Sequence, residues 1–288
     1  MLETIDRKFV SIVIFYSVGV KSRKYYLTLQ DITTTRNTML EYGRKIINAV
    51  FNRREKCPPI CAGLETKVAA DSGRSDIRMF EIGLSAQQYG DYEQGTRTST
   101  QEAIGANLIS IAKANGLFVP GENWAYYGDR KRRPSGESIV YLVKNAESVV
   151  KVRNPFAKNA IKQLHAQDII YEHLVHNVLF PNSRYRFIGI GKDVDGVRVI
   201  LSQRYLADMF AIPSQEDIDR YLVERLGLKP ENRYFYGNDY LAVTDVSADS
   251  DNVLTDGEKL FFIDPIIKMK RPATEILSYY YELMPNGR

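Results

Sequence analysis

The C-terminal part of the chain contains two apolar runs, and each of them delivers an aspartate. The first run, 241–244, leads to Asp245, and the second, 261–263, leads to Asp264. A polar loop between them ends in the sequence Asn-Val-Leu, which begins at Asn252, and a short turn follows. Short apolar runs bounded by turn residues are typical of strands. We expect a strand, a polar loop and a hairpin that returns Asp264. If strand-like runs pair across the turn in this way, the two aspartates and the asparagine converge, and this requirement constrains the fold of the whole region.

The composition is that of a soluble globular protein with 288 residues, 44% of them hydrophobic and 26% charged. This length suggests one large domain or two small ones. The positive charge is concentrated before residue 134, and the densest basic run is 130–133. Such a run before a proline is more often a solvated linker than a nucleic-acid patch, and the nucleic-acid interpretation remains the alternative.

Two features bear on the cellular compartment. The only cysteines, Cys57 and Cys61, do not form a disulfide framework, and no second pair of metal ligands lies near them in the sequence. The apolar stretch 9–20 is shorter than the ~20 residues that span a bilayer, and no clear cleavage site of a signal peptide follows it. We therefore expect a cytoplasmic protein with no membrane partner.

The residue pattern changes near Gly136, after a segment (117–135) rich in glycine, proline and basic residues. We expect an N-terminal α+β region (1–133) of unknown role and a second domain (134–288). In the first region we expect a strand pair at 9–16 and 24–29, a helix at 35–51, a further strand at 78–84 and a second helix at 99–115. The second is expected to have the order β-β-α-β-β-α-β-β. Its strands are expected at 138–143, 148–152, 185–190 and 198–205 and at the two runs described above. Its helices are expected at 155–177 and 215–226, with a final helix at 273–283.

Four further positions in the second domain have the character of a binding site. Gly136 allows backbone N–H groups to approach a phosphate closely. Lys151 is flanked by valines on an expected strand, so its side chain projects to one face. Asp168 and Glu172 are four residues apart on the next helix, so both lie on one helix face, and we favour Glu172 as the carboxylate that orients the lysine.

The region from about Gly136 to Met269 resembles the protein-kinase-like superfamily. It is most similar to the short kinase-like domain found in large polyvalent proteins of phages and mobile elements. The resemblance covers about half of the chain and rests on Gly136-Glu137-Ser138-Ile139-Val140-Tyr141, His176-Asn177-Val178-Leu179-Phe180-Pro181, Tyr185 with Gly189, Asp245, Asn252-Val253-Leu254 and Phe262-Ile263-Asp264. It implies a minimal kinase-like α+β fold, in which an antiparallel N-lobe sheet with one helix is followed by a reduced C-lobe.

The resemblance also implies roles for individual residues and two cofactors, ATP and Mg²⁺. Asp245 would accept or orient the proton of the substrate hydroxyl, and Asn252 and Asp264 would hold Mg²⁺. Lys151 would neutralise charge on the phosphates. The residues expected to bind or position the nucleotide are Gly136 and Ser138 in the phosphate-covering loop, Lys151, Glu172, and Gln203 and Tyr205 in the hinge that binds adenine.

The sequence departs from the kinase pattern at several points. Kinases place the asparagine five residues after the base aspartate, whereas Asn252 lies seven residues after Asp245, so the loop must bulge or Asp249 or Asp251 must take one of the roles. Val243-Thr244 replaces the usual His-Arg before the base, and Pro265-Ile266 replaces Phe-Gly after the metal ligand. The residues after Asp264 are too few for a full activation segment and helical C-lobe.

Two functions follow, and a third is weaker. The chain is expected to be an ATP- and Mg²⁺-dependent phosphotransferase that acts on a protein side chain or a small hydroxyl compound. The alternative is a degenerate kinase-like module that binds nucleotide or a partner without turnover. In the third hypothesis the basic N-terminal part binds nucleic acid, and the kinase-like part regulates it. His173 and His176, three residues apart on the expected helix, are interpreted as packing residues rather than as a metal pair.

Overall fold

The computed structural model describes residues 12–13, 26–27, 75–76, 78–83, 85–86, 97–130, 138–143, 148–157, 166–206, 211–232 and 234–283. The chain divides into two compact units, Met1–Lys45 and Ile46–Arg288. In the first unit, β1 (Ile12–Val13) and β2 (Tyr26–Leu27) pair antiparallel. This pairing agrees with the strand pair expected at 9–16 and 24–29. The expected helix 35–51, both cysteines and Gly136 lie outside the described residues.

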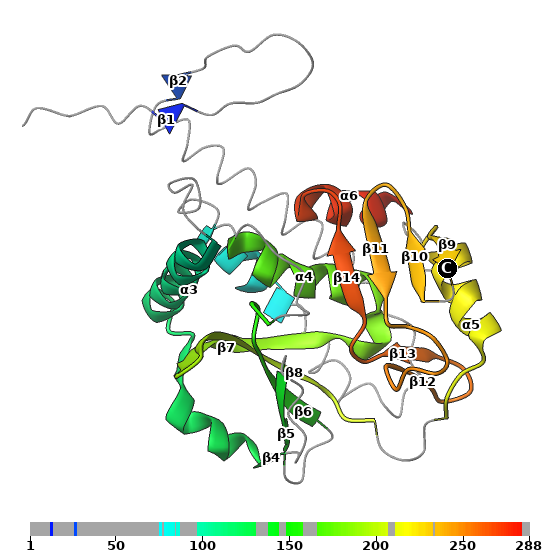
Figure 1. The fold of residues 1–288 in the computed structure, drawn as a ribbon, viewed down its shortest axis with the longest axis horizontal. Helices are drawn as coiled ribbons and strands as arrows, with labels where there is room; N and C mark the ends of the chain where they lie inside the picture. The colour runs from blue at the N-terminus through cyan, green and yellow to red at the C-terminus, as the bar shows by residue number, and fades with distance from the viewer. Residues whose placement is uncertain are drawn as a thin grey trace, which may run out of the picture. The chain divides into compact units, whose positions relative to one another are not determined.

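The second unit contains a six-stranded sheet with the order β3-β7-β8-β6-β5-β4 (Figure 1). The strands are β3 (Phe118–Pro120), β4 (Asp129–Arg130), β5 (Ser138–Leu142), β6 (Ser148–Arg153), β7 (Tyr185–Asp193) and β8 (Gly196–Arg204). β3 runs parallel to β7, and the other neighbours are antiparallel. Valine and isoleucine dominate the two central strands, β6 and β8, as expected for a buried sheet.

Helix α4 (Ala166–Leu179) is the central helix of this unit. From Ile169 to Phe180 all residues but one are buried, and they include Ile170, Leu174 and Leu179. The helix contacts β7 and α3 (Arg97–Ala114), and it also contacts α6 (Ala273–Leu283) and β14 (Ile266–Met269). A helix that is apolar on most of its surface must be covered by neighbours on several sides, and α4 therefore links the sheet to the C-terminal elements.

The C-terminal elements form a second, smaller antiparallel sheet and a separate hairpin (Figure 1). The sheet has the order β14-β11-β10-β9, with β9 (Lys229–Asn232), β10 (Phe235–Gly237) and β11 (Leu241–Thr244). The hairpin consists of β12 (Val253–Thr255) and β13 (Leu260–Phe262). The apolar run 241–244 therefore pairs with β10 and β14, and the run that leads to Asp264 pairs with β12. The predicted order of a strand, a polar loop and a hairpin that delivers Asp264 is confirmed by β11 and by the pairing of β12 with β13 across the turn.

The helix expected at 215–226 is confirmed. It consists of α5 (Gln215–Arg220) and a wider turn, Tyr221–Arg225. Ser214 is its N-cap, and the hydroxyl oxygen accepts a hydrogen bond of 3.1 Å from the backbone N–H of Asp217. Gly227 follows with φ of 64°, a left-handed conformation that glycine adopts without steric cost. The final helix expected at 273–283 is also present, as α6.

Two sequence-based assignments are corrected by the structure. Residues 78–83, expected to be a strand, are helical, because Met79, Phe80 and Ile82 are buried and the ring of Phe80 stacks on Tyr171 of α4. The helix expected from Pro155 begins later. The side chain of Asn154 accepts a hydrogen bond of 3.0 Å from the backbone N–H of Phe156, which forms a local turn instead.

The segment expected to separate two domains, 117–135, contains β3 and β4, which join the same sheet as β5 to β8. A 3₁₀ helix, Gly121–Tyr127, lies between them and contributes Trp124 to the core around Val150, Val152 and Ile200. The division into 1–133 and 134–288 stays a prediction. Any test of it has to keep β3 and β4 with the sheet.

A buried polar network fixes the end of α4 against β7. The side-chain amide of Asn177 donates to Asp76 Oδ1 and to the carbonyl oxygen of Tyr185, both at 2.8 Å, and its oxygen accepts from the Tyr185 backbone N–H at 2.7 Å. Arg184 also pairs with Asp76. Burial raises the pKa of Asp76 to about 6, although Arg184 and Asn177 act against this rise. Asp76 and Asn177 are fully buried, so water cannot replace a lost partner.

We predict that Asn177→Ala lowers the free energy of unfolding by about 2–4 kcal/mol, because it leaves buried polar groups without partners. The matched control is Asn232→Ala, which removes an exposed side chain that accepts one hydrogen bond, from Tyr234 N. This control should cost less than about 0.5 kcal/mol. Urea unfolding of both variants measures the difference, and equal losses would contradict a structural role for the network.

Candidate active site

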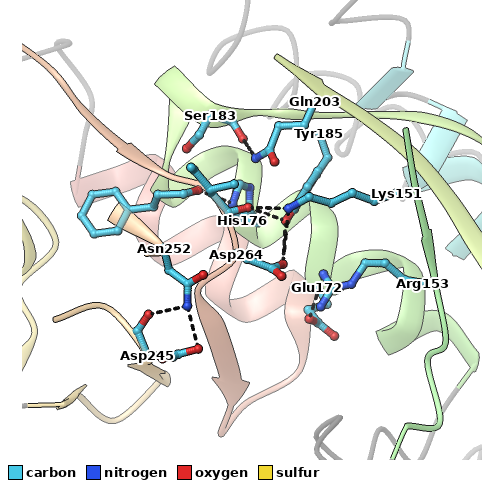
Figure 2. A network of polar contacts seen from close by, with 12 residues as sticks. Lys151, Arg153, Glu172, His176, Ser183, Tyr185, Gln203, Asp245, Asn252 and Asp264 are labelled. Carbon is cyan, nitrogen blue, oxygen red and sulfur yellow. Dashed lines mark hydrogen bonds and ion pairs between the residues drawn. The ribbon is translucent and has the colours of Figure 1, made fainter. Parts of the chain in front are cut away.

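Lys151 lies in the middle of β6, opposite Val140 of β5 and Leu201 of β8. Its side chain is only 6% exposed. The ammonium group donates a hydrogen bond of 2.9 Å to the carbonyl oxygen of Ile263 and lies 3.5 Å from Asp264 Oδ1 (Figure 2). A lysine from the centre of the sheet therefore meets the residues that directly follow β13, more than a hundred positions later in the chain.

Asp264 is held by more than the lysine. The hydroxyl of Tyr185, at the start of β7, donates to the Ile263 carbonyl at 2.9 Å and to Asp264 Oδ1 at 3.3 Å. Burial alone would raise the pKa of Asp264, but the charges of Lys151 and Arg153 and the Tyr185 hydroxyl outweigh it and hold the pKa below its usual value. The carboxylate is therefore ionised at neutral pH. Its side chain is 35% exposed, so one edge remains open to a ligand.

At Lys151 the effect of burial on the pKa exceeds the effect of the neighbouring carboxylate. Burial lowers the pKa of the ammonium group to about 8, and the attraction of Asp264 offsets only part of that change. The lysine is still mainly protonated at pH 7. A buried ammonium with a single half-exposed carboxylate beside it is costly for folding, and such groups are common at functional sites.

Asp245 directly follows β11 in a left-handed backbone conformation, with φ of 63°. Among the described residues it is the one non-glycine residue with positive φ. This conformation costs about 1–3 kcal/mol, and such strain is concentrated at functional sites. The side-chain amide of Asn252 donates to Asp245 Oδ2 at 2.6 Å and to the Asp245 backbone oxygen at 3.2 Å.

The loop between Asp245 and Asn252 accommodates its two additional residues as turns. The backbone N–H and the hydroxyl of Ser250 both bond to the carbonyl oxygen of Ser247, at 2.9 and 2.7 Å. Asn252 then returns to Asp245, and its carbonyl oxygen accepts a hydrogen bond of 2.7 Å from Ile263 N. The loop thus bulges, as one of the two sequence-based alternatives requires, and Asn252 lies next to the strand end that carries Asp264 (Figure 2).

The carboxylate of Glu172 has Arg153 as an ion-pair partner. Lys151 pairs with Asp264, whereas Glu172 Oε1 lies 4.0 Å from Arg153 Nη1. Arg153 is two residues beyond Lys151 on β6, so both side chains project to the same face of the sheet. Asp168, the other candidate, lies in the first turn of α4 and helps to raise the pKa of Tyr171. The role of Glu172 in nucleotide binding stays a prediction.

The remaining predicted residues lie on the sheet or beyond the described part of the chain. Ser138 begins β5 and is buried. Gln203, near the end of β8, is buried, and its side-chain amide donates to the carbonyl oxygen of Ser183 at 2.6 Å. Tyr205 directly follows β8. These placements leave the predicted roles in nucleotide binding untested.

His173 and His176 are buried in α4, and burial lowers the pKa of both, that of His176 to about 3, so both are neutral at pH 7. The Nε2 of His176 lies 3.2 Å from the Phe262 carbonyl oxygen. The centroid of the His176 ring lies 4.3 Å from the centroid of the Tyr185 ring. His176 and Tyr185 thus support the strand end before Asp264. Sequence reasoning used both residues for the resemblance but not for this support, because neither contact is local in sequence.

The donor set at this site suits Mg²⁺ held together with a phosphorylated ligand. No group of three His, Cys, Asp or Glu side chains in the described residues is placed to hold a metal ion by itself. Mg²⁺ is commonly bound by one or two protein oxygen ligands, with waters and phosphates completing the shell. The ionised Asp264 and the amide oxygen of the neighbouring Asn252 fit that pattern.

One of the comparisons with known proteins identifies a family. The family model for serine/threonine/tyrosine kinases found in polyvalent proteins matches residues 101–271, which include β3 to β14 and the whole site described above. No curated protein and no solved structure matches the chain. Separately, no helix among the described residues combines the length and apolarity needed to cross a membrane. The matched segment is more than half of the sequence, and the chain therefore belongs to the kinase family found in polyvalent proteins.

Proposed function

We propose that this protein transfers the γ-phosphoryl group of ATP to a hydroxyl group in a reaction that depends on Mg²⁺. The observation that carries the proposal is the convergence of four side chains from distant segments. Lys151 contacts Asp264, Asn252 contacts Asp245, and the backbone bond between Asn252 and Ile263 joins the two pairs. A cation, a metal-binding carboxylate, an amide and a base are the groups that phosphoryl transfer requires.

The surroundings of each residue support a proposed role. Lys151 is a mainly protonated, buried donor that can bind phosphate oxygens, and Asp264 and Asn252 supply oxygen ligands for the metal. Mg²⁺, when bound with ATP, neutralises charge on the β- and γ-phosphates. Asp245 is exposed at the end of β11, where it can receive the proton of an incoming hydroxyl. The hydroxyl oxygen forms a bond to the γ-phosphorus, the bond from that phosphorus to the β-phosphate oxygen breaks, and ADP leaves.

The family description supports a serine, threonine or tyrosine side chain as the acceptor, rather than a small hydroxyl compound. The exposure of Asp245 is consistent with a protein acceptor, since a bulky substrate must reach it from solvent. We therefore propose a protein kinase in the narrower sense.

One observation favours the second candidate, a kinase-like module that binds nucleotide without turnover. The Asn252 amide already occupies an oxygen of the proposed base at 2.6 Å. If this contact persists when nucleotide is bound, Asp245 is a weaker proton acceptor. Binding and turnover therefore have to be measured separately.

Replacement of the two aspartates separates these steps. We predict that Asp264→Asn abolishes the Mg²⁺-dependent part of ATP binding, whereas Asp245→Asn retains binding within about threefold and lowers the turnover rate at least about 100-fold. Calorimetric titration measures binding, and transfer of labelled γ-phosphate to the chain or to a mixed peptide library measures turnover. The matched control, Asp239→Asn, changes an exposed turn aspartate and should alter neither.

A wild type that binds ATP with Mg²⁺ but transfers no phosphate would support the binding module. Retained Mg²⁺-dependent binding in Asp264→Asn would contradict the assignment of the metal ligand.

The depressed pKa of Lys151 predicts a pH dependence of nucleotide binding. Phosphate binding requires the ammonium form, which is lost as the pH rises through about 8. We expect the affinity for ATP with Mg²⁺ to be nearly constant from pH 6.5 to 7.5 and about tenfold weaker at pH 9. Lys151→Arg should remove this dependence, because a guanidinium stays protonated. Equal pH profiles of the wild type and this variant would exclude Lys151 as the titrating group.

The same residue predicts a conflict between stability and function. A pKa lowered from 10.5 to about 8 corresponds to a folding cost of about 3 kcal/mol at pH 7. Since Lys151→Met removes that cost but also the partner of Asp264, we expect a net stabilisation of about 1–2 kcal/mol together with loss of ATP binding. The gain should shrink between pH 8 and 10.5, where wild-type Lys151 releases its proton on folding.

Urea unfolding at pH 7 and pH 10 measures this effect, and Lys192→Met, on an exposed position of β7, is the control with little expected change. A Lys151→Met variant that is several kcal/mol less stable at pH 7 would show that the lysine is a structural residue.

A further inference from the structure

A second cation stands beside Lys151 on the same face of the sheet. Arg153 ends β6, two residues after Lys151, and successive side chains of a strand alternate between its faces. Its guanidinium and the carboxylate of Glu172 lie 4.0 Å apart, and both side chains are about 20% exposed. Figure 2 shows Arg153 and Glu172 next to Asp264, on the side away from Asn252.

The strand register gives Arg153 a definite place along a bound nucleotide. Val149, near the start of β6, lies opposite Gln203, where the predicted hinge begins, and Lys151 lies opposite Leu201. Arg153 lies opposite Ser138, which is predicted to line the phosphates. From Val149 to Arg153 the strand advances about 13 Å. A nucleotide with its base at the hinge therefore extends its phosphates past Lys151 toward Arg153.

The electrostatics of the site agree with this placement. Arg153 is among the charges that lower the pKa values of Asp264, Lys151 and His173, so its field reaches the groups around the ion pair. A guanidinium is always protonated and offers a planar fork of donors that matches phosphate oxygens. Lys151, by contrast, is a point charge that titrates near pH 8.

We propose that Arg153 binds the terminal phosphate of the nucleotide and that Glu172 positions its guanidinium. This inference rests on the proposed function, because it specifies how the same site distinguishes a triphosphate from a diphosphate. Glu172 then acts through Arg153 rather than through Lys151. The predicted phosphate-covering segment contains only one glycine, Gly136. In this proposal, Arg153 on the sheet provides an additional contact to the phosphates.

The test compares the affinities for ATP and ADP, each with Mg²⁺, by calorimetric titration of the full chain. We expect Arg153→Gln to weaken ATP binding about 10- to 100-fold and ADP binding less than about threefold, since one charge-assisted contact to the terminal phosphate is lost. Arg153→Lys, which keeps the charge, should lose less than Arg153→Gln. The matched control is Arg186→Gln, an exposed arginine on β7 whose strand partner, Ser202, places it on the opposite face.

Glu172→Gln tests the positioning role. It should lower the ratio of ATP to ADP affinity in the same direction, and it should have almost no further effect in the Arg153→Gln background, because both changes act through one group. A further loss in that background would show that Glu172 serves Lys151 instead, which would overturn this part of the proposal.

The outcomes separate the two proposals. An unchanged ratio of affinities in Arg153→Gln, or equal losses for ATP and ADP, overturns the role of Arg153 and leaves the proposed function intact. A wild type that binds neither nucleotide overturns both. If Arg153→Gln does not fold, as judged by its thermal unfolding, the ratio measured for Arg153→Lys and Glu172→Gln decides the question.

Discussion

The ion pair between Lys151 and Asp264 is the interaction on which the site depends. It joins the central strand of the large sheet to the end of the β12–β13 hairpin, and the Tyr185 hydroxyl bonds to the same carboxylate and to the same backbone carbonyl as the lysine. Because the ammonium is buried and the carboxylate is partly exposed, the pair is asymmetric. Folding alone would be served as well by apolar side chains here, which agrees with the proposal that this pair binds a charged ligand.

The position of the C-terminal hairpin follows from a few specific contacts. Phe262 stacks on Phe180 of the segment after α4, and the Nε2 of His176 lies 3.2 Å from the Phe262 backbone oxygen. These contacts fix β13, which in turn fixes Asp264. On the other side, the left-handed backbone of Asp245 turns the chain after β11, and Asn252 closes the loop with two hydrogen bonds.

Much of the domain could be predicted from the sequence, and the failures have physical causes. The strands around Lys151 were predictable because valine-rich runs bounded by turns have few alternatives. The pairing of β11 with β14 was not, since strand partners depend on contacts distant in sequence. Residues 78–83 carry a pattern that suits a strand, but they are helical, and the ring of Phe80 packs on Tyr171 of α4. At the site, Arg153 could have been found from its spacing to Lys151, whereas the partner of Glu172 required the structure.

The most direct measurement is a crystal structure of the chain with a non-hydrolysable ATP analogue and Mg²⁺. We expect the phosphates beside Lys151 and the metal about 2.1 Å from oxygens of Asp264 and Asn252, with Asp245 facing the γ-phosphate. An analogue bound elsewhere, or a metal bound at this site without Asp264, would contradict this expectation.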